Sequence, residues 1–185
     1  NGGRLRLLGT WTNASGGVIS VSEGGTLTLG GNYTNDGDIE VTESTISVGG
    51  DFDASLLSGL TLTDIVGLTF TSGTFDNAGG TLTIDVPTIF SGITVEGGTI
   101  EVVTGGSLRV DSTSTLDDVI FNGDLTVRSV LRIATALELN GNCIGDNGYY
   151  SRVDFLSGGP AVSGTGEFQC PSSGQLNLQN TNNSN

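Results

Sequence analysis

The closest approach to a catalytic set in this sequence is a pair of adjacent carboxylates, Asp117 and Asp118, between two arginines. Arg109 and Arg128 are 19 residues apart. Carboxylates beside cations in a groove carry the acid–base chemistry of polysaccharide cleavage. Because neighbouring residues of a strand point to opposite faces, the two carboxylates share a groove only at a corner. We interpret them as solvated turn acids and expect no catalytic residues and no enzyme. A carbohydrate-binding or carbohydrate-cleaving protein is the alternative.

Composition narrows the chemistry further. The chain has no His, and its six basic residues are all Arg. Ser-His-Asp and Cys-His nucleophiles and His-based zinc sites are therefore excluded. The formal net charge of −14 disfavours the phosphates of nucleic acid and anionic lipid surfaces. No apolar run approaches the roughly 18 residues of a spanning helix. We expect neither a nucleic-acid partner nor a membrane span.

Clustered acids suggest calcium as a candidate cofactor. Asp36, Asp38 and Glu40 lie close together in the sequence, and hard cations prefer several oxygen ligands. The glycine-rich nonapeptide of calcium-binding β-rolls is absent from the chain. We interpret the acids as a solvated face, with a calcium site as the alternative, and expect no other cofactor.

The two cysteines, Cys143 and Cys170, predict a disulfide. The bond would close a loop of about 27 residues and favour an oxidising, extracellular location. Two buried thiols are the alternative. Asn13, Asn32 and Asn182 match the acceptor pattern for glycosylation.

Short strands punctuated by glycine would position all of these groups, because they recur about every 20 residues. The apolar centres Ile19, Leu27, Ile39 and Ile46 alternate between short and longer steps. Repetition at this length is typical of solenoids, whose units bury their apolar faces by stacking on one another. Alternating polarity and frequent glycine argue against a long helix. The sequence predicts an all-β, right-handed parallel β-helix (β-solenoid) with about 20 residues per coil and three sides.

An aromatic-x-Asn element supplies the third side of the first coils. It comprises Trp11 with Asn13, Tyr33 with Asn35, a degenerate copy at Phe52, and Phe75 with Asn77. The spacing of these aromatic residues matches the strand repeat. Stacked coils would form an inward aromatic ladder and an asparagine ladder at a corner.

Paired hydroxyls on the outward side of the predicted strands suggest a further alternative, an ice-binding surface. They are Thr26 and Thr28, Thr45 and Ser47, Thr61 and Thr63, and Thr81 and Thr83, which recur at nearly the strand repeat. The row stops at Glu101. Threonine is also well suited to strands, which explains the pairs without a ligand.

The rhythm divides the chain into three parts. For residues 1–140 the sequence predicts regular solenoid coils. These coils narrow after Asp124, because the strands there follow one another more closely. For residues 141–178 the sequence predicts irregular C-terminal coils that contain the disulfide. Residues 179–185 have no apolar anchor, so we expect a flexible tail there.

Several repeats resemble those of a known family. The segments 24–39, 125–141 and 164–167 resemble the repeats of filamentous-haemagglutinin-like and related bacterial surface adhesins. The resemblance covers about residues 9–170 and implies a right-handed parallel β-helix rod outside the cell, without transferring any binding residue. Two features depart from the family, the cysteine pair and the complete lack of Lys.

Together these features predict a non-enzymatic, secreted or cell-surface protein. It would be a structural or adhesive β-solenoid that serves as a rigid stalk or a filament building block. Its expected partners are further copies or neighbouring β-helix domains, joined end to end by strand addition, with cell-surface carbohydrate as a candidate ligand.

Overall fold

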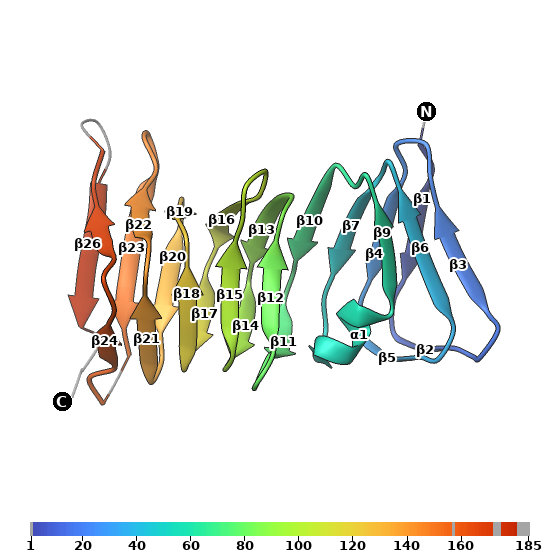
Figure 1. Ribbon diagram of the computed structural model, residues 1–185, viewed down its shortest axis with the longest axis horizontal. Helices are drawn as coiled ribbons and strands as arrows, with labels where there is room; N and C mark the ends of the chain where they lie inside the picture. Colours follow the sequence, from blue (N-terminus) through green and yellow to red (C-terminus); the bar gives the residue numbers. More distant parts are fainter. Residues whose placement is uncertain (1, 157, 172–174, 181–185) are drawn as a thin grey trace.

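The computed structural model describes residues 2–156, 158–171 and 175–180, and these form a parallel β-solenoid (Figure 1). It has about eight turns of about 21 residues, and only 2% of the chain is helical. The prediction of an all-β solenoid with a repeat of this length is confirmed.

Face A of the solenoid is one uninterrupted sheet of nine parallel strands in the described residues. In spatial order they are β1 (Arg4–Leu7), β4 (Thr26–Leu29), β7 (Thr45–Val48), β10 (Gly67–Phe70), β13 (Pro87–Ser91), β16 (Ser107–Ser112), β19 (Leu125–Val127), β22 (Asn142–Gly145) and β25 (Glu167–Gln169).

The spacing along one row of register partners on this face gives the number of residues in each turn. The row runs through Leu5, Leu27, Ile46, Leu68, Thr88, Leu108, Leu125, Cys143 and Phe168. The steps become shorter after Leu108, and the last step, from Cys143 to Phe168, is the longest. The coils therefore narrow after β16 and widen at the C-terminal end.

Faces B and C are each divided into two sheets. Face B consists of β2 (Thr10–Asn13) and β5 (Asn32–Asn35), followed by β8 (Phe52–Asp53), β11 (Gly73–Asp76), β14 (Ile93–Glu96), β17 (Ser114–Asp117), β20 (Val130–Ile133), β23 (Tyr150–Phe155) and β26 (Gln175–Asn180). Face C consists of β3 (Val18–Val21), β6 (Asp38–Thr42) and β9 (Leu60–Thr63), followed by β12 (Thr81–Ile84), β15 (Thr99–Val102), β18 (Val119–Asn122), β21 (Ala136–Leu139) and β24 (Ala161–Ser163). The predicted tail 179–185 lies mostly outside the described residues, and positions 179 and 180 end β26.

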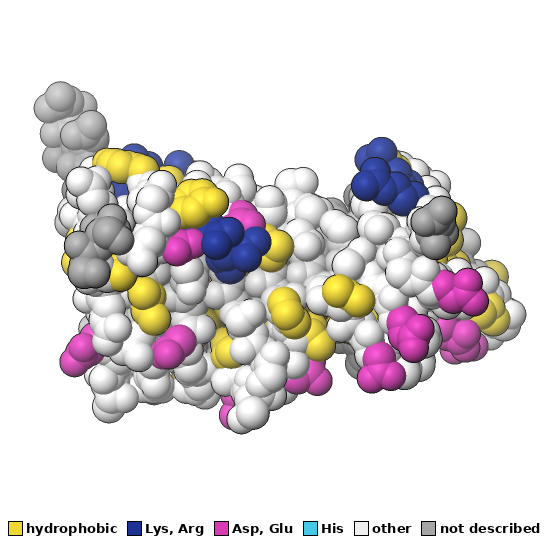
Figure 2. All heavy atoms as spheres, turned by 90° about the horizontal axis from the view of Figure 1, so that it is seen from above, with side chains coloured by type: hydrophobic (Ala, Val, Ile, Leu, Met, Phe, Trp, Pro, Cys, Tyr) yellow, Lys and Arg dark blue, Asp and Glu magenta, His cyan; other side chains and the backbone are white. Residues whose placement is uncertain are grey.

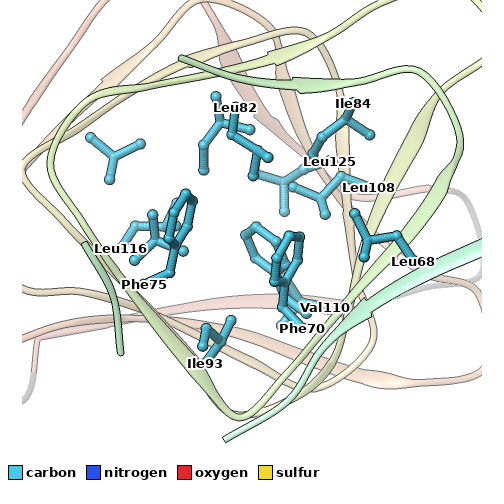
Figure 3. Packing of buried hydrophobic residues seen from close by; sticks show 14 of the residues in the cluster. Leu68, Phe70, Phe75, Leu82, Ile84, Ile93, Leu108, Val110, Leu116 and Leu125 are labelled. Atoms are coloured by element: carbon cyan, nitrogen blue, oxygen red, sulfur yellow. The ribbon is translucent and has the colours of Figure 1, made fainter. Parts of the chain in front are cut away.

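Alternating polarity builds the strands and fills a narrow core. In β6, Ile39 and Val41 are 0% exposed, while the acids beside them face solvent. Figure 3 shows how the three faces meet in the centre, with Phe70 from face A, Phe75 from face B and Ile84 from face C. Each coil buries its apolar side chains only against the coils above and below it, as expected of a solenoid.

One short helix, α1 (Ala54–Ser58), disturbs the third coil, which runs from β7 to β9 and is called coil 3 below. Asp53 caps the helix, because its Oδ1 accepts a hydrogen bond from the backbone N–H of Ser55 at 2.8 Å. Before the helix, β8 pairs forward with β11, and after it β9 pairs back with β6. Coil 3 is thus tilted between its neighbours. Face B opens between β5 and β8, and face C opens between β9 and β12.

Candidate functional site

A groove of about 940 Å³ lies at the split in face C. We call it the face C groove. Its walls are mainly apolar and include Leu57, Leu60, Leu62, Ile65 and Leu82. Figure 1 shows β9 and β12 well separated, with α1 at the lower end of the opening. The volume lies within the range of about 300–1,000 Å³ that is usual for binding sites.

The groove exposes positions that should belong to the core. In the register of β6 and β9, Leu62 occupies the same row as Val41. Val41 is 0% exposed, whereas Leu62 is 36% exposed. The difference arises because β12, which would cover Leu62 in a regular solenoid, is displaced to the next sheet. The apolar surface that coil 3 presents here has no neighbouring coil against it.

Main-chain groups also point into the groove. Consecutive residues of a parallel strand direct their N–H and C=O groups to opposite neighbours. The carbonyl of Thr63 accepts from the N–H of Glu43 at 3.0 Å, so Thr63 faces β6 and the main chain of Leu62 faces the groove. On the other wall, the carbonyl of Gly80 accepts from the N–H of Thr99 at 2.9 Å. Gly80 therefore faces β15, and the main chain of Thr81 faces the groove.

A smaller cavity of about 290 Å³ marks the split in face B. Tyr33 and Phe52 line it together with the acids Asp36, Asp51 and Asp53. The hydroxyl of Tyr33 is buried and has no hydrogen-bond partner among the described residues. Burial raises the pKa of Tyr33 to about 12, because the charged phenolate would lose its solvation.

The predicted aromatic ladder is divided by this cavity into two stacked pairs. Trp11 and Tyr33 are register partners, and their rings stack with centroids 4.6 Å apart. Phe52 and Phe75 are also register partners, with centroids 5.1 Å apart. Phe70 of face A stacks against each ring of the second pair at 5.9 Å. These rings pack the interior of the rod.

The predicted corner asparagines act on the backbone of neighbouring coils. The side-chain amide of Asn13 donates to Oδ1 of Asn35 at 2.8 Å and to the carbonyl of Asp38 at 3.2 Å. Asn77 is 1% exposed and donates to the carbonyl of Thr99 at 3.0 Å. The amide of Asn13 is committed to these bonds, which leaves it unsuited to glycosylation. Asn32 is exposed, and Asn182 lies outside the described residues.

The predicted disulfide between Cys143 and Cys170 is wrong. Cys143 points into the core from β22 and is 0% exposed, whereas Cys170 follows β25 and is exposed. In the register of these strands the neighbour of Cys143 is Phe168, and Cys170 lies beyond the end of β25. Burial raises the pKa of the Cys143 thiol to about 12. The alternative of two buried thiols holds for Cys143 only.

The calcium candidates Asp36, Asp38 and Glu40 do not come together as a site. Asp38 and Glu40 are exposed on the outer side of β6, and Asp36 follows β5. Within the described ranges, no three Asp, Glu, Cys or His side chains form a group that could hold a metal ion.

The paired acids Asp117 and Asp118 lie apart from the ion pairs that the two arginines make. Arg109 binds Asp111 through Nε and Nη2 at 2.6 and 2.7 Å, which holds the pKa of Asp111 below its usual range. Arg128 pairs with Asp146 and also lies over the ring of Tyr149, with its Cζ 4.8 Å from the ring centroid.

The two acids themselves occupy the end of β17 and the corner after it. Asp117 accepts a hydrogen bond from the hydroxyl of Thr135 one coil away. Asp118 turns the corner with a φ of 58°. The ion pairs of Arg109 and Arg128 went unpredicted. The signal for the first pair is the Arg-x-Asp spacing at 109–111, which places both side chains on one face of a strand. The pair of Arg128 with Asp146 joins neighbouring coils and has no such local signal.

The predicted row of hydroxyls is wrong, because its members lie on different faces. Thr26 and Thr45 are register partners on face A. Thr61 belongs to face C and pairs with Glu40, while Thr81 lies in the other sheet of face C. The register partner of Thr45 in the next coil is Gly67, so a full turn from Thr45 ends at Gly67 and Thr61 comes before the turn is complete. The ice-binding alternative loses its flat surface.

These features define a β-solenoid repeat protein whose main irregularity is the face C groove. No protein-family model, curated protein or solved structure gives a significant match to the chain. None of the helices in the described residues is long and apolar enough to cross a membrane.

Proposed function

We propose that the protein is a non-enzymatic, extracellular or cell-surface β-solenoid that acts as a rigid adhesive stalk or as a building block of filaments. The observation that carries this proposal is the uninterrupted face A, in which a parallel ladder runs from β1 to β25. Continuous ladders along the long axis, packed on a continuous core, resist bending and stretching.

The location outside the cell has narrower support. The repeats at 24–39 resemble those of bacterial surface adhesins. Cys143 is a buried thiol outside any disulfide and adds no support for this location. Figure 2 shows acidic side chains spread along the surface, which keeps neighbouring rods apart in solution. Labelling of intact, unpermeabilised cells with an antibody against the protein tests the location, and labelling only after permeabilisation contradicts it.

Assembly end to end would use the two outermost strands of face A. Arg4 and Arg6 are exposed on β1, and Glu167 and Gln169 are exposed on β25. If a second copy adds its β1 to β25 in the register of the preceding coil, Arg4 meets Glu167. Such a head-to-tail contact is heterologous and generates open filaments.

Electron microscopy of the purified protein over a range of concentrations tests both parts of this proposal. We expect thin rods of one subunit width whose lengths are multiples of one subunit. Arg4→Glu should shorten them, and the added change Glu167→Arg should restore their length. Rods that remain single at every concentration would remove end-to-end assembly, whereas round particles would remove the rigid stalk as well.

A further inference from the structure

The face C groove has the form of a sheet from which one strand has been left out. On face A, Ile46 of coil 3 is the register partner of Leu68 in the next coil. The same step along the chain places Leu60 opposite Leu82 and Leu62 opposite Ile84 across the groove. Leu60 and Leu82, and likewise Leu62 and Ile84, are therefore the positions that would be register partners if face C were continuous, but β9 and β12 belong to separate sheets.

We infer that the groove binds one extended segment of a partner protein, which is added as a parallel strand between β9 and β12. The main chain of Leu60 and Leu62 faces the groove from one wall, and that of Thr81 and Thr83 faces it from the other. A single added strand can hydrogen-bond to both walls. Its odd-numbered residues direct their N–H and C=O groups to one wall, and its even-numbered residues direct theirs to the other. Strand addition to an open sheet edge is a common mode of peptide recognition.

The side chains of the walls define the sequence that the added strand needs. The inward residues are Leu60 and Leu62 in β9 and Leu82 and Ile84 in β12. Two apolar side chains at alternate positions of the added strand would continue these rows and cover Leu62, which is 36% exposed. The residue between them would point outward beside Thr61, where a hydroxyl or another polar group is suited.

Charge defines the end of the segment. The charged residues that line the groove in the described part of the chain are Asp64 and Asp85, and both are exposed. They follow β9 and β12, so they lie where the added strand would end. A Lys or Arg directly after the second apolar residue would lie between the two carboxylates. With a net charge of −14, a second copy of this chain is a poorer occupant than a basic segment of another protein.

Sugars are less suited to the groove than a strand. Carbohydrate sites present aromatic faces and many polar groups, whereas the aromatic ring of this groove, Phe75, is 1% exposed. The inference goes beyond the proposed function, because a stalk needs no groove. The proposal of a stalk and the inference of a peptide-binding groove can each be wrong without affecting the other. A rod in the electron microscope is compatible with any result below.

The probe is a fluorescein-labelled, amide-terminated peptide of sequence Gly-Thr-Ile-Thr-Leu-Arg-Gly, whose binding to the full chain is measured by fluorescence anisotropy. Two control peptides are compared with the probe. One has N-methyl groups on alternate amides, and the other has Glu in place of Arg. We expect saturable binding of the probe and about tenfold weaker binding of each control. A neutral oligosaccharide such as cellohexaose serves as the competing class of ligand. Displacement of the probe by the oligosaccharide at equal concentration would overturn the assignment to a polypeptide.

Protein variants locate the binding. Leu62→Trp fills the groove and should weaken binding about tenfold, whereas Val18→Trp changes an exposed apolar residue of the same sheet and should leave binding unchanged. The double variant Asp64→Asn with Asp85→Asn should bind the Arg-containing probe and the Glu-containing control peptide equally. Equal binding by all of these variants would overturn the inference.

Hydrogen exchange tests the groove even if a variant fails to fold. In the unbound protein the amides of Leu60, Leu62, Thr81 and Thr83 should exchange faster than those of β6, and the peptide should protect them. Protection of these amides before any peptide is added would show that β9 and β12 pair with each other, which overturns the inference. Failure of the probe to bind while the amides stay unprotected overturns it too.

Discussion

The side-chain amide of Asn13 reaches across one coil and donates to Oδ1 of Asn35 at 2.8 Å. The contact shows how this solenoid fixes its corners. Polar side chains are buried there to satisfy the backbone of the next coil, since buried groups without partners are costly. The same arrangement recurs three coils later at Asn77, which is 1% exposed.

Removing the Asn13 amide should destabilise the fold. Asn13→Ala leaves the carbonyl of Asp38 and Oδ1 of Asn35 without that donor, at a cost of about 1–3 kcal/mol. Asn32→Ala, an exposed asparagine of the paired strand, should change stability by less than about 0.5 kcal/mol. Urea denaturation of both variants makes the comparison, and equal losses would contradict a role for the corner amide.

Two glycines provide a matched test of close packing at the asparagine corner. Gly79 and Gly98 have φ values of 71° and 69°, so an added Cβ is strained at both. Only Gly98 is also crowded, because its Cβ would lie 2.0 Å from the carbonyl oxygen of Asn77, whereas Gly79 has open space. Gly79→Ala should cost roughly 1–2 kcal/mol. Gly98→Ala should cost at least about 2 kcal/mol more in the same denaturation experiment, and similar costs would argue against crowding at this corner.

The buried hydroxyl of Tyr33 should reduce stability. It lacks a partner among the described residues, while the ring stacks on Trp11 at 4.6 Å. Tyr33→Phe keeps the stacked ring and removes the unsatisfied group, so the melting temperature should rise, with a gain of about 1 kcal/mol. Trp11→Ala, which removes the stack, is the comparison and should lower it. A lower melting temperature for Tyr33→Phe would mean that the hydroxyl has a hydrogen-bond partner.

The two thiols should differ sharply in reactivity. Cys143 is buried with its pKa raised to about 12, so its reactive thiolate is scarce at neutral pH. Cys170 is exposed. Titration of the folded protein with a disulfide reagent should detect one fast thiol, and a second should appear in denaturant. Cys170→Ser should eliminate the fast reaction, and failure to detect any thiol would restore the disulfide.

Stability should fall in alkali. The pKa of Cys143 rises on folding from 9.0 to about 12, and that of Tyr33 from 10.0 to about 12. Above pH 9 the unfolded chain therefore releases protons that the folded chain retains, so the free energy of unfolding decreases between about pH 9 and 12. Cys143→Ala should make this decrease shallower, although its stability at pH 7 is lower. An unchanged slope would argue against burial of the thiol.

The fold could be predicted because its signals are local and repeated. The strand at 24–29 has the glycine pair and the alternation that the structure confirms in β4, and Trp11 and Tyr33 are register partners as their spacing indicates. The hydroxyl row failed because a turn has no fixed length. Similar steps along the sequence can therefore end on different faces, as they do at Thr45 and Thr61.

The candidate groove could not be predicted, because it depends on the tilt of one coil. Phe52-Asp53-Ala54 looks like a weakened aromatic-x-Asn element, and in fact Ala54 begins α1. Asp53 as a helix cap before two leucines was the available signal. Nothing local in the sequence states that β8 pairs forward and β9 pairs back, since strand pairing is decided by packing between distant residues.

The tilt of coil 3 also gives the rod a weak cross-section. Between this coil and the next, the chain is joined by the ladder of β7 with β10 and by the short ladder of β8 with β11. A pull along the axis would load fewer hydrogen bonds here than at levels where all three faces are paired. The first rupture under tension should therefore occur at this level and release residues 1–63 from the rest, so that the molecule yields at a fixed place.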